Sequence, residues 1–299
     1  MKFLSLATFA FLLIYCSNSN NKKSNSISSI KVKKEKKDPK FNAYWYQGTA
    51  EITSYKLSQV RYGEIHEGTA VNIYVTEDFL PKKQVKADSK NKFNVPILKL
   101  NSTKKFTTGI YPYSLMTSTF SPINLTKNAI KISFSSQEWC GNTFVQLNNR
   151  DNFEIDFYSY FETNADKELS LKKEPLENNF WNVLRINPKS IKKGRYKVIP
   201  SMEYLALNHK KIQAYDAETN LIEKGNFLYF SVYYPRLQRK LTIQLTKKFP
   251  YNIESWKETS TINGQKMVTT AEKIKTIQSA YWNKNGVTNT EERKLLGLN

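Results

Sequence analysis

Hydrophobic and polar residues alternate with a period of two along much of the chain. In the segment 152–161, Phe153, Ile155 and Phe157 fall on one face of an extended chain and polar residues fall on the other. This alternation is typical of a strand that buries one face. The same pattern occurs in 69–79, 128–137 and 239–248, whereas 227–234 is apolar on both faces, as expected for a central strand.

Turn signals separate these segments, and the clearest is Asn263-Gly264, which favours a two-residue hairpin. Helical patterns are few: 175–188 and 288–298 each predict one short helix. We therefore predict a mainly β fold with a minor helical part. Its large antiparallel sheet should curl into an open barrel or a sandwich, and residues 41–299 should form a single β-rich domain.

The first residues of the chain predict export. Phe3 to Tyr15 is uncharged, mostly apolar and too short to span a bilayer, so residues 1–15 are interpreted as a signal peptide. The run ends in Leu13-Ile14-Tyr15-Cys16, which resembles the lipobox of bacterial lipoproteins. That resemblance implies cleavage before Cys16 and a lipid on its thiol. Tyr15 departs from the small residue that usually precedes this cysteine.

Residues 17–40 consist mainly of Ser, Asn and Lys, a composition that predicts a disordered linker. Together with Cys16 they would form a lipidated tether, so residues 16–40 are taken as one segment. The linker's lysines would either attract an anionic bilayer or simply be solvated. Ser17 and Asn18 follow the cysteine without an acidic cluster, which favours an outer-membrane location facing the periplasm.

The chain carries a net charge of +20, but its lysines are scattered as pairs and no aromatic nucleic-acid motif accompanies them. We therefore expect no nucleic-acid partner. Two His and two Cys, without metal-ligand spacing, predict no metal site and no cofactor. A lone cysteine such as Cys140 is more often a small buried apolar residue than a nucleophile.

Several segments of the chain resemble a family of flavobacterial-type envelope lipoproteins of unknown function. The resemblance is carried by 44–79, 98–122, 135–148, 198–217 and 247–258. Members of that family are often labelled "septum formation inhibitor Maf". The Ser-Pro-Arg-Arg-like loop of the Maf pyrophosphatases has no counterpart here, and the period-two pattern is not that of their α/β fold. The resemblance implies a lipoprotein and carries over no functional residues.

Two functional hypotheses follow. In the first, the curved sheet binds a hydrophobic ligand or an acyl chain, although the same side chains could simply form a core. The candidate ligand-lining residues are Phe134, Trp139, Phe153, Ile155 and Phe157. In the second, a structural lipoprotein docks on another envelope protein through the tyrosines Tyr74, Tyr158 and Tyr160, because Tyr is enriched at interfaces. An enzyme is a third hypothesis, with Glu138 beside Cys140 and with Arg61 or His66 as partners.

Overall fold

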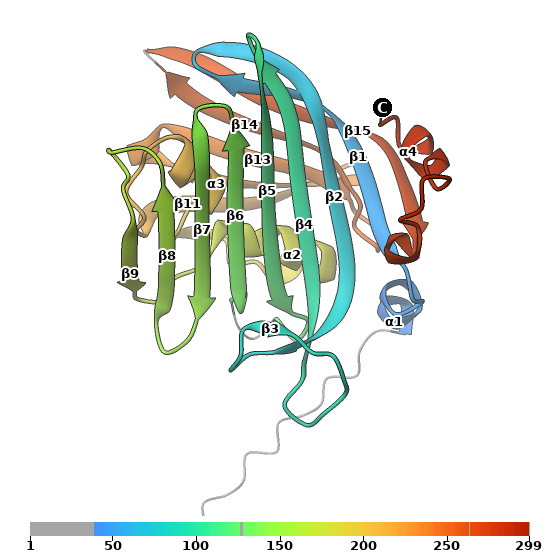
Figure 1. The fold of residues 1–299 in the computed structure, drawn as a ribbon. Helices are drawn as coiled ribbons and strands as arrows, with labels where there is room; N and C mark the ends of the chain where they lie inside the picture. Colours follow the sequence, from blue (N-terminus) through green and yellow to red (C-terminus); the bar gives the residue numbers. More distant parts are fainter. Residues whose placement is uncertain (1–38, 126–127, 263, 299) are drawn as a thin grey trace, which may run out of the picture. The chain divides into compact units, whose positions relative to one another are not determined.

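The alternating segments form one antiparallel sheet of 15 strands in the computed structural model, which describes residues 39–125, 128–262 and 264–298 (Figure 1). The first part of the chain contributes β1 (Ala50–Arg61), β2 (Glu64–Leu80), β3 (Val85–Lys86), β4 (Val95–Thr108), β5 (Tyr111–Pro122), β6 (Lys131–Glu138), β7 (Gly141–Asn149), β8 (Phe153–Ser159) and β9 (Lys167–Leu171). The second part contributes β10 (Gly194–Val198), β11 (Tyr215–Lys224), β12 (Phe227–Tyr234), β13 (Arg239–Thr246), β14 (Ile253–Ile262) and β15 (Gln265–Ser279).

Helices connect or cover these strands. They are α1 (Pro39–Trp45), α2 (Glu177–Ile186), α3 (Met202–Leu207), α4 (Glu291–Leu295) and the short 3₁₀ turns η1 (Pro188–Ser190), η2 (Pro235–Leu237) and η3 (Tyr281–Asn283). The two helices expected from the sequence are α2 and α4; α1 and α3 were not expected. Because Pro188 cannot continue a helix, α2 ends at Ile186. Ser201 caps α3 by accepting a hydrogen bond from Tyr204 N at 3.2 Å.

Strand order follows the sequence as a meander, and β15 pairs with β1 to join the two parts. The order is β10-β11-β12-β13-β14-β15-β1-β2-β4-β5-β6-β7-β8-β9, with β3 paired to β2. Ile262 pairs with Gln265 across the predicted hairpin turn. Thus the prediction of a mainly β fold with a large, open antiparallel sheet is confirmed, and β9 and β10 are the end strands of this order.

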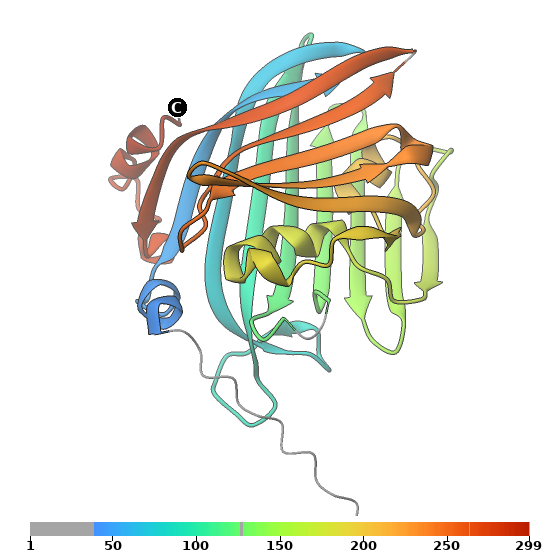
Figure 2. The same ribbon diagram turned by 180° about the vertical axis from the view of Figure 1, so that it is seen from behind.

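The sheet bends over α2, so that β11–β15 pass behind β4–β8 and the helix lies between the two walls (Figures 1 and 2). Phe180 of α2 contacts Phe230 of β12 with ring centroids 5.2 Å apart, and Trp181 contacts Trp256 of β14 at 5.3 Å. On the other wall, Asn182 Nδ2 donates to Leu98 O at 2.9 Å. The main hydrophobic core therefore fills the concave side of the sheet around this helix.

A smaller apolar cluster lies on the convex side. Ala50, Ile52 and Val75 are buried there against Leu296, which follows α4. Val71 and Ile73 pack against the same cluster, so the apolar face of 69–79 turns away from the main core. The opposite face carries Tyr74, which is only 1% exposed. The expectation that Tyr74 is an exposed docking residue is therefore wrong.

Candidate functional site

Both ends of α2 are held by buried ion pairs. At its C-terminal end, Arg185 Nη1 and Nη2 donate to Glu51 of β1 at 2.5 and 2.6 Å. At its N-terminal end, Glu177 accepts from Arg239 of β13 at 2.6 and 2.7 Å. All four side chains are 1% exposed. Ion pairs therefore join α2 to β1 and β13, in addition to the packing of its apolar side chains.

The pair at the start of α2 extends into a larger network. Arg239 also donates to Glu258 Oε2 at 2.7 Å, and Tyr234 OH donates to Glu177 Oε2 at 2.7 Å. The Arg239 guanidinium lies 4.2 Å from the centre of the Tyr204 ring. Burial would raise the pKa of Glu258, but the Arg239 charge and hydrogen bond outweigh it and hold that pKa below its usual value. The Glu258 carboxylate therefore remains ionised at neutral pH.

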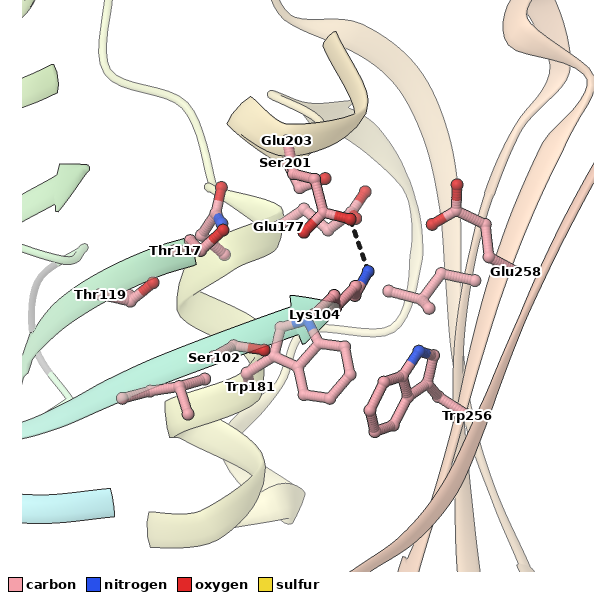
Figure 3. Close-up of a pocket in the computed structure, with 13 residues that line it drawn as sticks. Ser102, Lys104, Thr117, Thr119, Glu177, Trp181, Ser201, Glu203, Trp256 and Glu258 are labelled. Carbon is pink, nitrogen blue, oxygen red and sulfur yellow. Dashed lines mark hydrogen bonds and ion pairs between the residues drawn. The ribbon is translucent and has the colours of Figure 1, made fainter. Parts of the chain in front are cut away.

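A cavity of about 50 Å³ lies beside this network, between α2, β4 and β14 (Figure 3). Its polar lining includes Glu203, whose carboxylate accepts from Lys104 Nζ at 2.5 Å, and Thr117, whose buried Oγ1 has no hydrogen-bond partner among the described residues. A site that holds an organic ligand usually measures about 300–1,000 Å³, whereas a water needs only about 10–15 Å³. This interior space suits a few waters and is too small for an acyl chain.

A larger concavity opens at the free edge of the sheet. It measures about 340 Å³ and lies between β8, the β8–β9 loop and β9 on one side and the α3–β11 loop on the other. We call it the edge groove. Its lining residues are Phe157, Thr163, Asn164, Lys167, Leu169, His209, Lys210, Lys211 and Ile212.

The edge groove combines an apolar floor with a basic border. Phe157 and Ile212 are buried and Leu169 is half-buried, whereas Lys167, Lys210 and Lys211 are exposed. None of the three lysines forms an ion pair with a described residue. The groove therefore offers apolar contact next to unneutralised positive charge.

His209 closes one end of the edge groove. Its Nδ1 lies 2.8 Å from Asn164 Nδ2, and its ring meets the edge of Phe161 with centroids 6.0 Å apart. Burial, and then the nearby Arg61 charge, lowers the pKa of His209 below its ordinary value. The ring is therefore neutral at pH 7, and the positive charge of the groove comes from its lysines.

A still larger hollow of about 510 Å³ lies over β10, β11 and the end of β12. Its charged residues are mixed in sign, and Arg195 Nε donates to Glu218 at 3.3 Å within it. Its lining carries one basic residue, Arg195, and two acidic ones, Asp216 and Glu218, so this hollow, unlike the edge groove, does not favour an anionic ligand.

The five proposed ligand-lining residues lie in three different surroundings. Phe134, Phe153 and Ile155 are buried in the main core, and Phe157 belongs to the core and also to the floor of the edge groove. Trp139 lies apart from them on the β6–β7 turn, where it is 69% exposed. The exposed positions of Tyr158 and Tyr160 are as the sequence indicated.

Of the residues of the enzyme hypothesis, Glu138 contacts Cys140 and His66 contacts Arg61, and they are not arranged for nucleophilic catalysis. Glu138 Oε2 accepts from Cys140 N at 2.7 Å, and its hydrogen bond raises the pKa of the Cys140 thiol. His66 Nε2 lies 3.2 Å from Arg61 O. An activated thiol needs a lowered pKa, whereas the Glu138 carboxylate raises that of Cys140. Cys140 is also exposed, and not the buried apolar residue that a lone cysteine usually is.

The sequence did not reveal the basic border of the edge groove. Lys210 and Lys211 were visible only as one of several Lys pairs, and Lys167 lies 43 positions earlier. Only the folding of the chain places β9 opposite the α3–β11 loop. The predicted lipid-attachment residue Cys16 lies outside the described residues, and no helix within them is long and apolar enough to cross a membrane.

Comparison with known proteins gives no further assignment. No family model matches the chain. No curated protein and no solved structure matches it either.

Proposed function

We propose that this chain is a lipid-anchored, non-catalytic envelope protein that binds an amphiphile with an anionic head group in the edge groove. The apolar tail would lie on Phe157, Leu169 and Ile212, and the head group would meet Lys167, Lys210 and Lys211. The observation that carries the proposal is the combination of an apolar floor and unpaired lysines in one groove of about 340 Å³.

Size is the first argument for this location. The concave side of the sheet is filled by core residues and α2, and the cavity beside them is only about 50 Å³. The edge groove falls within the range of small-molecule sites, about 300–1,000 Å³. A hydrophobic ligand therefore has room at the edge of the sheet without any displacement of α2.

Charge is the second argument. Three exposed lysines border the groove, and a carboxylate or phosphate that lies among them gains charge-assisted hydrogen bonds. Lys167 is flanked in sequence by Asp166 and Glu168. Asp166 Oδ1 accepts instead from Ser159 N at 3.1 Å, and Glu168 follows Lys167 in β9, so its side chain points to the opposite face of the strand. The groove thus favours an anionic head group over a neutral or cationic one.

The proposal is tested by titrating the chain from Ser17 onward, which lacks the predicted lipid anchor, with cis-parinaric acid, a fluorescent fatty acid. We expect saturable binding that Leu169→Ala weakens and that the double variant Lys210→Ala, Lys211→Ala weakens by about tenfold or more, since charge-assisted hydrogen bonds contribute about 1.5–3 kcal/mol each. The matched control is Lys82→Ala, Lys83→Ala, which removes an exposed lysine pair distant in sequence from the groove residues and should leave binding unchanged.

Two results would contradict the proposal. One is wild-type protein that does not bind the fatty acid; the other is equal loss of affinity in both double-lysine variants. The methyl ester of the same fatty acid gives a further check, because a neutral ligand should bind more weakly. Absence of binding in the wild type would favour the alternative function, an anchored lipoprotein that docks on another envelope protein.

A further inference from the structure

The hairpin turns at one end of the sheet carry large exposed apolar side chains. Tyr62 of the β1–β2 turn is 62% exposed, Ile110 of the β4–β5 turn 80%, Trp139 of the β6–β7 turn 69%, and Tyr160 at the end of β8 75%. The β1–β2, β4–β5, β6–β7 and β8–β9 turns lie along the upper edge of the sheet in Figure 1. We call these four residues together with Tyr111 the aromatic rim.

Contacts between neighbouring turns hold the aromatic rim in place. Tyr62 OH lies 2.7 Å from Tyr113 OH, and the rings of Tyr111 and Trp139 have centroids 6.3 Å apart. Tyr160 lies over Gly141, where a Cβ would come within 2.9 Å of the tyrosine ring. These contacts therefore fix the positions of the rim side chains without a bound partner.

Solvent-exposed turns are usually formed by polar residues, Gly and Pro, and not by large apolar residues. The β7–β8 turn at the other end of the sheet is formed by Arg150, Asp151 and Asn152, as is usual for a solvated turn. Large apolar groups that remain exposed on adjacent turns indicate an interaction surface. Tyr and Trp in particular are enriched where one part of the ring meets an apolar phase and its polar group meets water.

We propose that the aromatic rim docks on the surface of a lipid bilayer that contains anionic lipids. The argument for a bilayer rests in part on the proposed amphiphile site, because the rim continues into the edge groove. Phe161 follows Tyr160 in the chain, and its ring centroid lies 6.0 Å from that of His209. Lys210 and Lys211, which border the edge groove, come directly after His209. A bilayer supplies both an interface for Tyr and Trp and negative charge for the lysines.

The tether is long enough for this orientation. Twenty-two residues separate the predicted anchor Cys16 from Pro39, where α1 begins. Extended, they would span about 75 Å, whereas the 12 residues of β1 between α1 and the rim span about 40 Å. An anchored chain can therefore bring its rim to the membrane that holds it.

The test is co-sedimentation of the chain from Ser17 onward with vesicles of phosphatidylethanolamine and phosphatidylglycerol. We expect the wild type to sediment, and the double variant Ile110→Ser, Trp139→Ser to bind about tenfold more weakly, because two large side chains no longer enter the interface. The matched control is Trp282→Ser, Val287→Ser, which also removes one exposed tryptophan and one exposed aliphatic residue, but from the C-terminal segment. Equal unfolding midpoints for the variants and the wild type would show that folding is unaffected.

The outcomes separate the two proposals. A rim variant that no longer sediments but binds cis-parinaric acid in solution supports docking and leaves the edge groove intact. A Leu169→Ala variant that sediments with vesicles but does not bind the fatty acid would show that the edge groove is impaired while the aromatic rim still binds the bilayer. Wild-type protein that stays in the supernatant overturns the docking proposal, and so does equal weakening of the rim variant and its control. In that case, capture of a purified envelope protein through Trp139 would assign the rim to a protein interface.

Discussion

Arg185 is enclosed at the end of α2 with its guanidinium 5.1 Å from the Trp45 ring centre and 4.7 Å from that of Tyr74. It shares Glu51 with Tyr44, whose hydroxyl donates to the same carboxylate. Such a pair is costly to bury and is more costly still to break, because removal of one partner leaves the other charge without compensation. Nothing in the sequence joins Glu51 to Arg185, which lie 134 positions apart.

We predict that Glu51→Gln lowers the free energy of unfolding by about 3–5 kcal/mol at pH 7, since Arg185 then remains charged and buried without a carboxylate. Urea denaturation followed by tryptophan fluorescence measures the change. Arg195→Ala is the control, because the Arg195–Glu218 pair is 86% and 52% exposed and should contribute less than about 1 kcal/mol. Equal effects of the two substitutions would contradict the interpretation.

The Glu51–Arg185 pair should also make the free energy of unfolding depend on pH. Burial would raise the pKa of Glu51, but its ion pair with Arg185 and hydrogen bonds from Arg185 and Tyr44 outweigh burial and lower that pKa below its ordinary value of 4.5. A lowered carboxyl pKa contributes stability above the unfolded pKa, and that stability is lost as the pH falls through the folded pKa. The difference between wild type and Glu51→Gln should therefore be constant from pH 7 to about 5 and shrink below about pH 4. A difference that grows on acidification would contradict the lowered pKa.

Among the elements, the long alternating strands and α2 were predictable because each has a local periodic signal. The short helices α1 and α3 have 7 and 6 residues, too few for a clear periodicity. The face of β2 that meets the main core was not predictable, since Val71, Ile73 and Val75 form the more apolar face of the strand when it is considered alone. They instead face the convex side because the C-terminal segment around Leu296 covers them.

Gly68 allows two strands to approach closely. It lies in β2, paired with Leu57 of β1 and Phe106 of β4. A Cβ added there would overlap the carbonyl oxygen of Lys105 and lie 2.8 Å from Phe106 Cβ. Because the obstructing atoms belong to the backbone and to a Cβ, they cannot move as the end of a flexible side chain can.

We therefore predict that Gly68→Ala destabilises the protein by about 3 kcal/mol, at the upper end for overpacking. Thermal unfolding followed by circular dichroism measures this loss of stability. Gly225→Asn is the control: Gly225 lies in a turn with φ of 59° and no atom within 4 Å of an added Cβ, and Asn tolerates this conformation. A Gly68→Ala protein as stable as the control would show that β2 and β4 can separate at little cost.

For the whole molecule, the sequence indicated an open sheet but not where its edges lie. Both edge strands, β9 and β10, have only five residues and carry exposed charges, including Lys167 and Lys197. Short, charged edges discourage pairing with another chain, so an open sheet can persist without aggregation. The edge groove forms beside one of these edges from segments that are distant in sequence. A local pattern therefore could not predict the groove, although it correctly placed Phe157 on an apolar face.

The last prediction concerns how the sheet domain is held in the cell. If Cys16 carries the acyl groups of a lipoprotein, the chain should remain with the membrane fraction, because each buried methylene contributes about 0.8 kcal/mol and two chains suffice for stable anchoring. Cys16→Ser should release the protein to the soluble fraction or leave an uncleaved precursor. Cys140→Ser, which removes the other cysteine, should leave fractionation and the mass of the N-terminal peptide unchanged. A wild-type chain that is soluble and begins at a residue other than Cys16 would contradict lipid attachment. The aromatic rim would then have to provide membrane contact by itself, and vesicle binding by the unanchored chain measures whether it does.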